Sequence, residues 1–216
     1  MKRTEIGTSI KKAKLLLDRS EIVSIPTETV YGLAANGNNK QAIAKIYAAK
    51  KRPLSNPLIL HYKDASSAFK DVTIVPKDAE TLAENFWPGP LTMLLPKKQT
   101  IPDSVTAGKK RVAIRVPQHK LCQALLETLA YPLAAPSANL YGRISPTSPA
   151  HVKEQLNKRI PYILDGGICE KGIESTIIGF ENDTPIIYRL GSISIEEIEA
   201  CIQKKVGLKN KLESNQ

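Results

Sequence analysis

Apolar residues follow helical and strand-like periods in alternation along this chain. Between residues 9 and 18 they recur every three or four positions with lysines on the other side, the pattern of an amphipathic surface helix. Residues 22–25 form instead a short apolar run that stops at Pro26, which predicts a strand. Asn39 is a typical N-cap for the helix that follows it, and Pro53 ends that helix beyond Lys50.

The rest of the chain continues this alternation. Its apolar periods predict helices at residues 78–86, 120–130, 149–156 and 195–202. They predict strands at residues 58–62, 91–95, 112–116, 133–135, 162–164, 175–180 and 186–190. Alternation of this kind favours one layered α/β (α+β) domain, with a twisted mixed β-sheet flanked by helices. No repeat or Gly/Ser-rich linker divides the chain, so we expect a domain over residues 1–203 and a polar tail over residues 204–216.

Composition restricts the class of protein. Hydrophobic residues make up 42% of the 216 positions and charged residues 24%, which is ordinary globular composition and excludes a disordered or fibrous chain. No apolar stretch approaches the ~20 residues of a membrane helix, so we expect no membrane association. The three cysteines are widely spaced and form no CxxC pair. A disulfide framework is therefore not expected, and a reducing cytoplasm fits best.

The net charge of +10 is concentrated in two blocks. Residues 1–63 hold 12 basic and 4 acidic side chains, and residues 97–120 hold 7 and 1, whereas residues 121–200 hold 6 and 10. A clustered positive field attracts polyanions such as RNA, DNA, nucleotides or anionic lipid. Charge alone does not choose among these partners, and it also fits a role in solubility.

Five stretches combine hydroxyl, amide or cationic side chains with the ends of predicted elements, where α/β proteins place their ligands. No P-loop and no GxGxxG fingerprint occurs, so a nucleotide would need a different apparatus. The five stretches are Pro-Thr-Glu-Thr-Val-Tyr-Gly-Leu from Pro26, Lys-Lys-Arg-Pro-Leu-Ser-Asn-Pro from Lys50, Phe-Trp-Pro-Gly-Pro-Leu-Thr from Phe86, Ala-Pro-Ser-Ala-Asn from Ala135, and Glu-Ser-Thr-Ile from Glu174.

The first four of these stretches, together with Arg115 in Val-Ala-Ile-Arg-Val-Pro, resemble the YrdC family of threonylcarbamoyl-AMP synthases, also called TsaC. The resemblance spans residues 8–200 with the motifs in the family's order, and the chain resembles the short, single-domain form. It implies a YrdC-like fold and a nucleotidyltransferase that condenses L-threonine, bicarbonate and ATP to L-threonylcarbamoyladenylate and pyrophosphate. The product would supply the N6-threonylcarbamoyladenosine modification of tRNA.

The resemblance also implies which residues bind the two larger substrates. For threonine, these are Thr29, His61, Arg115, Ala135 and Ser175. The guanidinium fork of Arg115 suits bidentate binding of a carboxylate, and Ala135 would act through its backbone. His61 could accept the amine proton. A surface arginine on a strand and a histidine that only packs at a strand end are the alternative interpretations.

For ATP, the implied residues are Lys50, Arg52, Asn56, Arg111, Ser137, Asn139, Ser145 and Arg189. Lys50 and Arg52 are the expected catalytic cations, because charge builds on the pyrophosphate as it leaves. Two residues that are two positions apart can both face one triphosphate only if the helix has unwound before Pro53. Cations at a helix C-terminus that merely complement its dipole are the alternative for this segment.

Cofactors and partners complete the expectations. No His, Cys or carboxylate pattern suggests a metal cage, so Mg²⁺ would arrive with ATP. The basic face would bind tRNA or double-stranded RNA, and the tRNA threonylcarbamoyl-transfer machinery is a possible partner. Two other functions remain open at this point: a non-catalytic RNA-binding module, and a carbamoyl-handling relative with a different acceptor. Arg115 with Thr29 and Ser175 favours the enzyme, because a pure RNA binder has no use for an amino-acid clamp.

Overall fold

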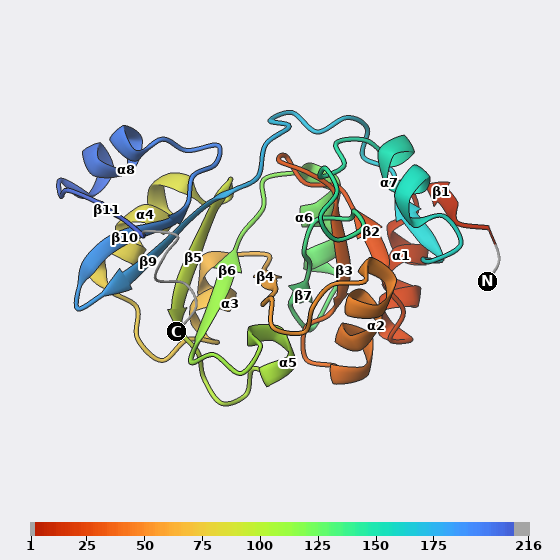
Figure 1. The fold of residues 1–216 in the computed structure, drawn as a ribbon, viewed down its shortest axis with the longest axis horizontal. Coiled ribbons are helices and arrows are strands. Elements are labelled where there is room, and N and C mark those ends of the chain that lie inside the picture. Colours follow the sequence, from red (N-terminus) through yellow and green to blue (C-terminus); the bar gives the residue numbers. More distant parts are fainter. Residues whose placement is uncertain (1–2, 210–216) are drawn as a thin grey trace.

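The structure is a computed structural model and describes residues 3–209. Within this range eleven strands form one mixed sheet in the order β1-β8-β2-β3-β7-β4-β6-β5-β9-β10-β11 (Figure 1). The strands are β1 (Glu5–Gly7), β2 (Val23–Ile25), β3 (Gly32–Asn36), β4 (Ile59–His61), β5 (Leu91–Pro96), β6 (Arg111–Arg115), β7 (Leu133–Ala134), β8 (Tyr162–Leu164), β9 (Thr176–Glu181), β10 (Thr184–Arg189) and β11 (Gly207–Leu208). The helices are α1 (Ile10–Asp18), α2 (Lys40–Lys50), α3 (Ala65–Phe69), α4 (Lys77–Phe86), α5 (Asp103–Thr106), α6 (Lys120–Glu127), α7 (Pro149–Leu156) and α8 (Ile195–Ile202).

Local sequence sets where the longer helices begin. The side chain of Ser9 accepts a hydrogen bond from the backbone of Lys12 at the start of α1, and Asn39 caps α2 in the same way. Ser194 and Glu197 form a reciprocal capping box at α8. These caps satisfy backbone N–H groups that a helix leaves unpaired at its N-terminus. The helix starts predicted from the sequence at Ser9 and Asn39 are therefore confirmed.

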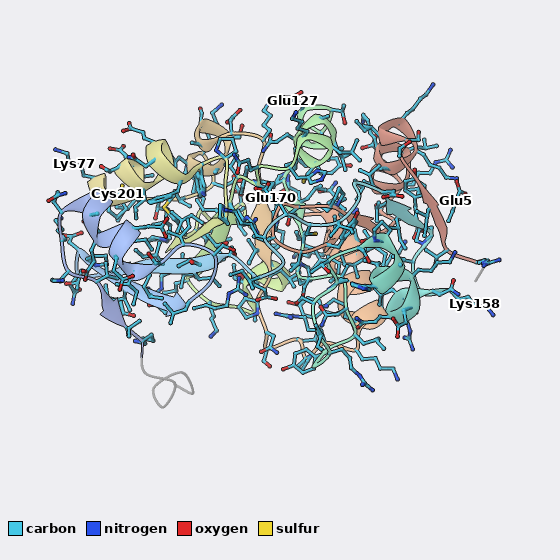
Figure 2. The ribbon with its side chains drawn as sticks, turned by 90° about the horizontal axis from the view of Figure 1, so that it is seen from above. Glu5, Lys77, Glu127, Lys158, Glu170 and Cys201 are labelled. Atoms are coloured by element: carbon cyan, nitrogen blue, oxygen red, sulfur yellow. The ribbon has the colours of Figure 1, made fainter. Side chains whose placement is uncertain are left out.

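Helices cover the two faces of the sheet unequally. Helices α1 and α6 pack on one face, in a core with Val23, Ile25 and Ala34, whereas α2, α3, α4 and α7 pack on the other face, in the larger core (Figure 1). Figure 2 labels Lys77 at the start of α4 and Glu127 at the end of α6, one helix from each face. The strands around β2 and β3 are thus enclosed from both sides, and their side chains fill two hydrophobic cores.

Strands β4, β5 and β6 have helices on one face only. Their other face is open and forms the base of a cavity. Along β6, Val112 and Ile114 enter the core, while Arg111, Ala113 and Arg115 point to the other face and line a cavity. Because side chains alternate along a strand, one short sequence supplies both a core layer and a row of site residues. Strand β4 pairs in parallel with β6 and places His61 directly beside Arg115.

The expected fold class is confirmed, and each of the predicted helices and strands is present with small shifts at its ends. Five elements were not predicted: β1, β3, α3, α5 and β11. The sequence of β3, Gly-Leu-Ala-Ala-Asn, has little intrinsic strand preference, and its pairing with β2 and β7 decides its conformation. The other four elements have at most five residues each, too few for a periodic signal.

Strand β11 lies in the stretch that was expected to be a polar tail. It pairs in parallel with β10, and Lys209 follows it with its backbone N–H bonded to the carbonyl of Ile187 at 2.9 Å. Residues 210–216 of the predicted tail lie outside the described part. Within residues 3–209, no helix has the length and apolar character needed to cross a bilayer.

Candidate functional site

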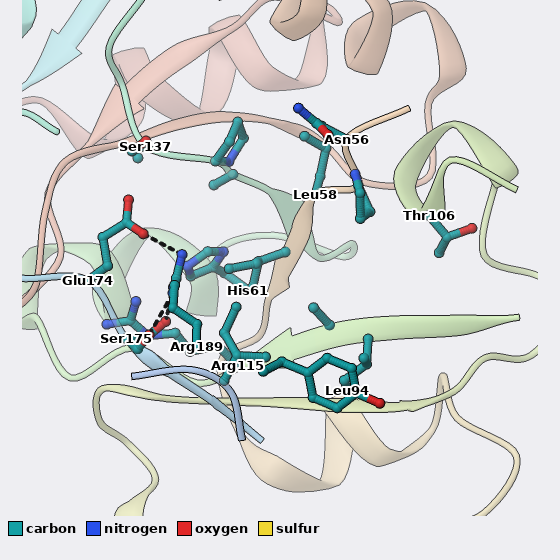
Figure 3. Close-up of a pocket in the computed structure, with 18 of the residues that line it drawn as sticks. Asn56, Leu58, His61, Leu94, Thr106, Arg115, Ser137, Glu174, Ser175 and Arg189 are labelled. Atoms are coloured by element: carbon teal, nitrogen blue, oxygen red, sulfur yellow. Dashed lines mark hydrogen bonds and ion pairs between the residues drawn. The ribbon is translucent and has the colours of Figure 1, made fainter. Parts of the chain in front are cut away.

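A cavity of about 760 Å³ opens on the uncovered face of the sheet (Figure 3). Its walls come from chain segments that are far apart in sequence but adjacent in the sheet. They include all five residues expected to bind threonine: Thr29, His61, Arg115, Ala135 and Ser175. Of the residues expected to bind ATP, the lining includes Arg52, Asn56, Arg111, Ser137 and Arg189. The tertiary structure therefore brings the whole predicted threonine set and five of the eight predicted ATP residues to one cleft.

Positive charge dominates among the side chains that line this cleft. Seven lysine and arginine side chains line it: Arg52, Lys109, Lys110, Arg111, Arg115, Arg189 and Lys209. Glu174 is the sole carboxylate among the lining residues in the described chain. A low-dielectric cavity with this excess of cations attracts and holds anionic ligands.

Arg115 is fixed at the bottom of the cleft by contacts on three sides. Its side chain is 4% exposed, and its Nη2 contacts Glu28 Oε1 at 2.7 Å and Thr29 Oγ1 at 3.0 Å. Its Nε donates to the carbonyl of Gly89 at 3.2 Å. The interpretation of Arg115 as a mere surface residue is therefore wrong. A guanidinium that is buried and oriented in this way is suited to bind a carboxylate.

Two pairs of hydroxyl groups flank Arg115. Thr29 Oγ1 lies 2.8 Å from Thr27 Oγ1, and Ser175 Oγ lies 2.8 Å from Thr92 Oγ1. All four side chains are buried. Hydroxyl groups held in such pairs have their rotors fixed, so they present defined donors or acceptors to a ligand. These contacts hold the hydroxyl groups of Thr29 and Ser175 at the lining of the cleft.

His61 is buried and electrically neutral. Burial, and secondarily the charge of Arg115, lowers the pKa of the imidazole to about 3. Its Nδ1 is buried without a hydrogen-bond partner among the described residues. An imidazole of such low basicity does not retain a proton taken from an ammonium group. This low pKa disfavours His61 as the group that accepts the amine proton.

Lys50 lies beside the cleft and not in its lining. It is 1% exposed, and its Nζ donates to the carbonyl groups of Ser137 and Asn139, each at 2.5 Å. Burial, together with the charge of Arg52, lowers the pKa of this amine to about 7. Lys50 therefore holds the segment that carries Ser137 in place. The helix ends at this residue, and Lys51 takes a left-handed conformation with φ of 55°.

Arg52 reaches the cleft because the chain turns after Lys50. Its Nε donates to the carbonyl of Asn56 at 3.1 Å, and its Nη2 donates to the carbonyl of Pro57 at 2.9 Å. The amide of Asn56 donates in turn to the hydroxyl of Tyr141 at 2.9 Å. The unwinding expected before Pro53 is present, but it directs only Arg52 into the cleft while Lys50 stays buried.

Asn139 and Ser145 do not line the cleft in the described chain. The amide nitrogen of Asn139 donates to the carbonyls of Leu140 and Arg143 at 2.8 and 2.7 Å, so this side chain shapes its own loop. Ser145 Oγ donates to Glu174 Oε1 at 2.9 Å. Arg111 lies at the other end of the cleft, 5.3 Å above the ring of Tyr188.

Arg189 links the two predicted substrate regions. Its Nε donates to the carbonyl of Ser175 at 3.0 Å, and its Nη2 donates to Ser175 Oγ at 2.9 Å (Figure 3). Its Nη1 forms an ion pair with Glu174. The same guanidinium thus contacts a residue expected to bind threonine and a carboxylate among the cations.

The sequence interpretation missed two acidic residues of the site, Glu28 and Glu174. Both lie inside motifs that had been singled out, next to the residues that were chosen. The signal available was an acidic residue in a stretch otherwise made of hydroxyl groups and expected to bind anions. Such a residue needs a cationic partner, and the structure identifies Arg115 and Arg189 as those partners.

The sequence of this chain is similar to the sequences of known proteins. Residues 15–191 match the Sua5/YciO/YrdC family, which is described as "Telomere recombination". A protein of Bacillus subtilis named threonylcarbamoyl-AMP synthase is 49% identical over 195 residues, which cover 89% of this chain and 56% of that protein. A protein of the same name from Pyrococcus abyssi is 42% identical over 193 residues, which cover 89% and 57%. The chain thus spans a little more than half the length of these curated relatives.

Solved structures extend the similarity to three dimensions. Sua5 of P. abyssi in complex with L-threonine superimposes with a TM-score of 0.94 at 38% identity, covering 99% of this chain and 65% of that chain. YciO of E. coli superimposes with a TM-score of 0.79 at 23% identity, covering 90% and 99%, and supports the fold alone.

The neutral state of His61 predicts a pH dependence of stability. The unfolded chain takes up a proton on this histidine near pH 6.5, whereas the folded chain does so only near pH 3, so stability falls as the pH drops between these values. The free energy of unfolding of the wild type should fall between pH 7.5 and pH 5. We expect the fall in the His61→Gln variant to be smaller by about 1 to 2 kcal/mol. Urea unfolding at both pH values measures this, with His151→Gln on the exposed surface of α7 as the matched control. Equal losses in the wild type and His61→Gln would contradict the prediction.

The buried ion pair of Glu28 with Arg115 predicts a large cost for removing its acidic partner. Glu28→Ala leaves an uncompensated guanidinium in the interior and should lower the free energy of unfolding by about 3 kcal/mol. Glu5→Ala is the matched control, because its pair with Lys12 is exposed and should contribute little. Urea unfolding at neutral pH measures both. Similar small losses in the two variants would show that the buried pair is not essential to the fold.

Proposed function

Because the chain belongs to the Sua5/YciO/YrdC family, we propose that it is a threonylcarbamoyl-AMP synthase. It would condense L-threonine, bicarbonate and ATP to L-threonylcarbamoyladenylate and pyrophosphate. The observation that supports this most directly is the buried, oriented guanidinium of Arg115, which shares one cleft with a row of further cations. An amino acid and a polyphosphate need those two features side by side.

Arg115 would bind the carboxylate of threonine. Its Nη2 and Nε are already directed by Glu28 and Gly89, so little conformational entropy is lost when the substrate arrives. Thr29 and Ser175 stand on either side with hydroxyl groups held by their partners. These groups would fix the amino acid in a single orientation, with its amine directed toward the remainder of the cleft.

The amine would take up carbon dioxide, supplied by bicarbonate, to form a carbamate. A carbamate oxygen would then attack the α-phosphorus of ATP, and the bond to pyrophosphate would break. Neutral His61 would serve as a hydrogen-bonding group near this step, and the released proton would pass to solvent or to bicarbonate. No covalent enzyme intermediate is required, because positioning of two anions accounts for most of the catalysis.

Arg52 and Arg189 would stabilise the charge that moves onto the pyrophosphate. Both guanidinium groups are held by backbone carbonyls of the protein, Arg52 by Asn56 and Pro57 and Arg189 by Ser175. Preorganised cations need no reorientation while the charge develops, which is the main source of electrostatic catalysis. Lys50 would contribute by holding the segment of Ser137 and Asn139, and Asn56, Arg111 and Ser145 would complete the nucleotide site.

Mg²⁺ would enter with ATP, held by phosphate oxygens and water. Within residues 3–209, no group of three or more His, Cys, Asp or Glu side chains could hold a metal ion. The donors available to the ion are therefore mainly those of the nucleotide itself.

The product would serve the threonylcarbamoyl modification of tRNA, and the basic blocks would give the chain a weak, salt-sensitive affinity for tRNA. The same proposal includes, as partners, the proteins that transfer the threonylcarbamoyl group to tRNA. The free cysteines Cys122, Cys169 and Cys201 suit a reducing compartment such as the cytoplasm. A purely RNA-binding role leaves the buried amino-acid clamp unexplained.

The reaction predicts that pyrophosphate appears only when threonine, bicarbonate and ATP are all present. Omission of each substrate in turn, with pyrophosphate measured by a coupled assay, tests this. Serine should retain partial activity, because one methyl group is worth only about 1 kcal/mol of discrimination. Pyrophosphate release without threonine, or equal release with serine and valine, would contradict the proposed substrate.

The two neighbouring cations of the turn predict opposite outcomes. Arg52→Ala should lower the turnover of pyrophosphate release roughly 10²-fold, the scale of losing one electrostatic donor. Lys51→Ala is the matched control, because this exposed residue is outside the cleft lining of the described chain and should retain turnover. Melting temperatures of both variants separate lost chemistry from lost folding. Equal, small effects in the two variants would contradict the role of Arg52.

A further inference from the structure

Glu174 is a carboxylate in a cleft built for anions. The other charged lining residues of the described chain are cations, and Glu174 interacts with two of them, Arg52 through its charge and Arg189 through a direct ion pair. An acidic side chain here opposes the binding of a polyphosphate by charge repulsion. Its presence needs a physical explanation that the proposed reaction does not supply.

Both carboxylate oxygens of Glu174 have a donor, and one of the two donors, Arg189, lines the cleft. Oε2 pairs with Nη1 of Arg189 (Figure 3), and Oε1 accepts at 2.9 Å from Ser145 Oγ, which is outside the cleft lining of the described chain. A phosphate group accepts from the same kind of donor as a carboxylate, since the guanidinium fork binds both with similar geometry. The carboxylate and a phosphate of the ligand therefore have Arg189 as a common partner.

Arg189 has one partner that it can exchange easily. Its Nε and Nη2 are bonded to the carbonyl and the hydroxyl of Ser175, and these bonds anchor the guanidinium to the sheet. Only Nη1 contacts a side chain that is itself about one-third exposed, Glu174. Exchange of this partner leaves the contact between Arg189 and Ser175 intact.

The backbone of Glu174 is fixed by the neighbouring segment, independently of the contacts of its side chain. The carbonyl of Glu174 accepts from the backbone of Ser192 at 3.1 Å, and a Cβ atom added at Gly191 would lie 2.3 Å from that carbonyl. A displacement of the carboxylate therefore requires rotation of the side chain alone. Such rotations are fast and need no movement of the loop.

We propose that Glu174 competes with a phosphate group of the nucleotide for Arg189, and so sets the affinity of the cleft for ATP. The inference rests on the proposed function, in which this region binds the triphosphate. In the absence of nucleotide the carboxylate keeps Arg189 oriented, and the phosphate then replaces it on the same guanidinium. The chain thus gains a positioned arginine at the cost of weaker ATP binding.

Glu174→Gln tests this directly, because it keeps the size of the side chain and removes its charge. An ATP analogue with a methylene group between the α- and β-phosphorus atoms avoids turnover, and calorimetric titration gives its dissociation constant. We expect roughly threefold to tenfold tighter binding in the variant, both with MgCl₂ and with EDTA. The KM for ATP in pyrophosphate release should fall in parallel.

Glu170→Gln is the matched control. Glu170 lies on the same segment between β8 and β9, is exposed, and is labelled in Figure 2. It removes the same charge without a contact to Arg189, so its affinity for the analogue should stay within about twofold of the wild type. The threonine affinity of Glu174→Gln, measured in the same way, should be unchanged and shows that the variant is folded.

Three results would overturn the inference. Unchanged affinity for the analogue in Glu174→Gln means that the carboxylate does not compete. Weaker affinity that higher Mg²⁺ restores means that Glu174 is a ligand of the metal that accompanies ATP. A wild-type chain that does not bind the analogue refutes the proposed function and this inference together, whereas normal wild-type binding without a change in the variant refutes this inference alone.

Discussion

A buried ion pair between Arg115 and Glu28 is the interaction on which the cleft depends. Arg115 lies on β6, whereas Glu28 belongs to the segment between β2 and β3. Burying either charge alone is prohibitive, and their contact at 2.7 Å makes the burial of both acceptable. The second carboxylate oxygen of Glu28 also accepts from the backbone of Gln118 at 3.1 Å. The pair therefore ties two halves of the sheet together at the position where an amino acid would bind.

Three further cations at or beside the cleft, Lys50, Arg52 and Arg189, are held by oxygen atoms of the protein itself. Lys50 donates to the carbonyls of the segment at Ser137, and Arg52 donates to the carbonyls that follow its own turn. Arg189 is anchored on Ser175 and balanced by Glu174. These three cations are oriented before a ligand arrives, so the cleft offers a fixed field to anionic groups of a ligand. The same arrangement separates cations that shape the site, such as Lys50, from cations that face the ligand, such as Arg52.

Much of the fold could be predicted, because strong local signals mark its elements. The caps at Ser9 and Asn39 and the apolar periods of the helices and longer strands lie in the sequence itself. Strand β3 could not be predicted, because Ala and Gly have little strand preference and pairing with β2 and β7 decides the matter. The short elements β1, α3, α5 and β11 could not be predicted because each has at most five residues, too few for a periodic signal.

The sequence by itself determined the kind of chemistry: motifs rich in hydroxyl groups and cations, in an order that resembles one enzyme family, indicated an amino acid and a nucleotide as ligands. Only the tertiary structure decided what each residue does. It buried Lys50 on backbone carbonyls, lowered the pKa of His61 by burial, and paired Arg115 and Arg189 with Glu28 and Glu174. The physical reason is that burial and partner contacts set the charge and orientation of a side chain. The contacts of Lys50 with Ser137 and of Arg115 with Thr29 join residues that are 87 and 86 positions apart, and no local pattern encodes such contacts.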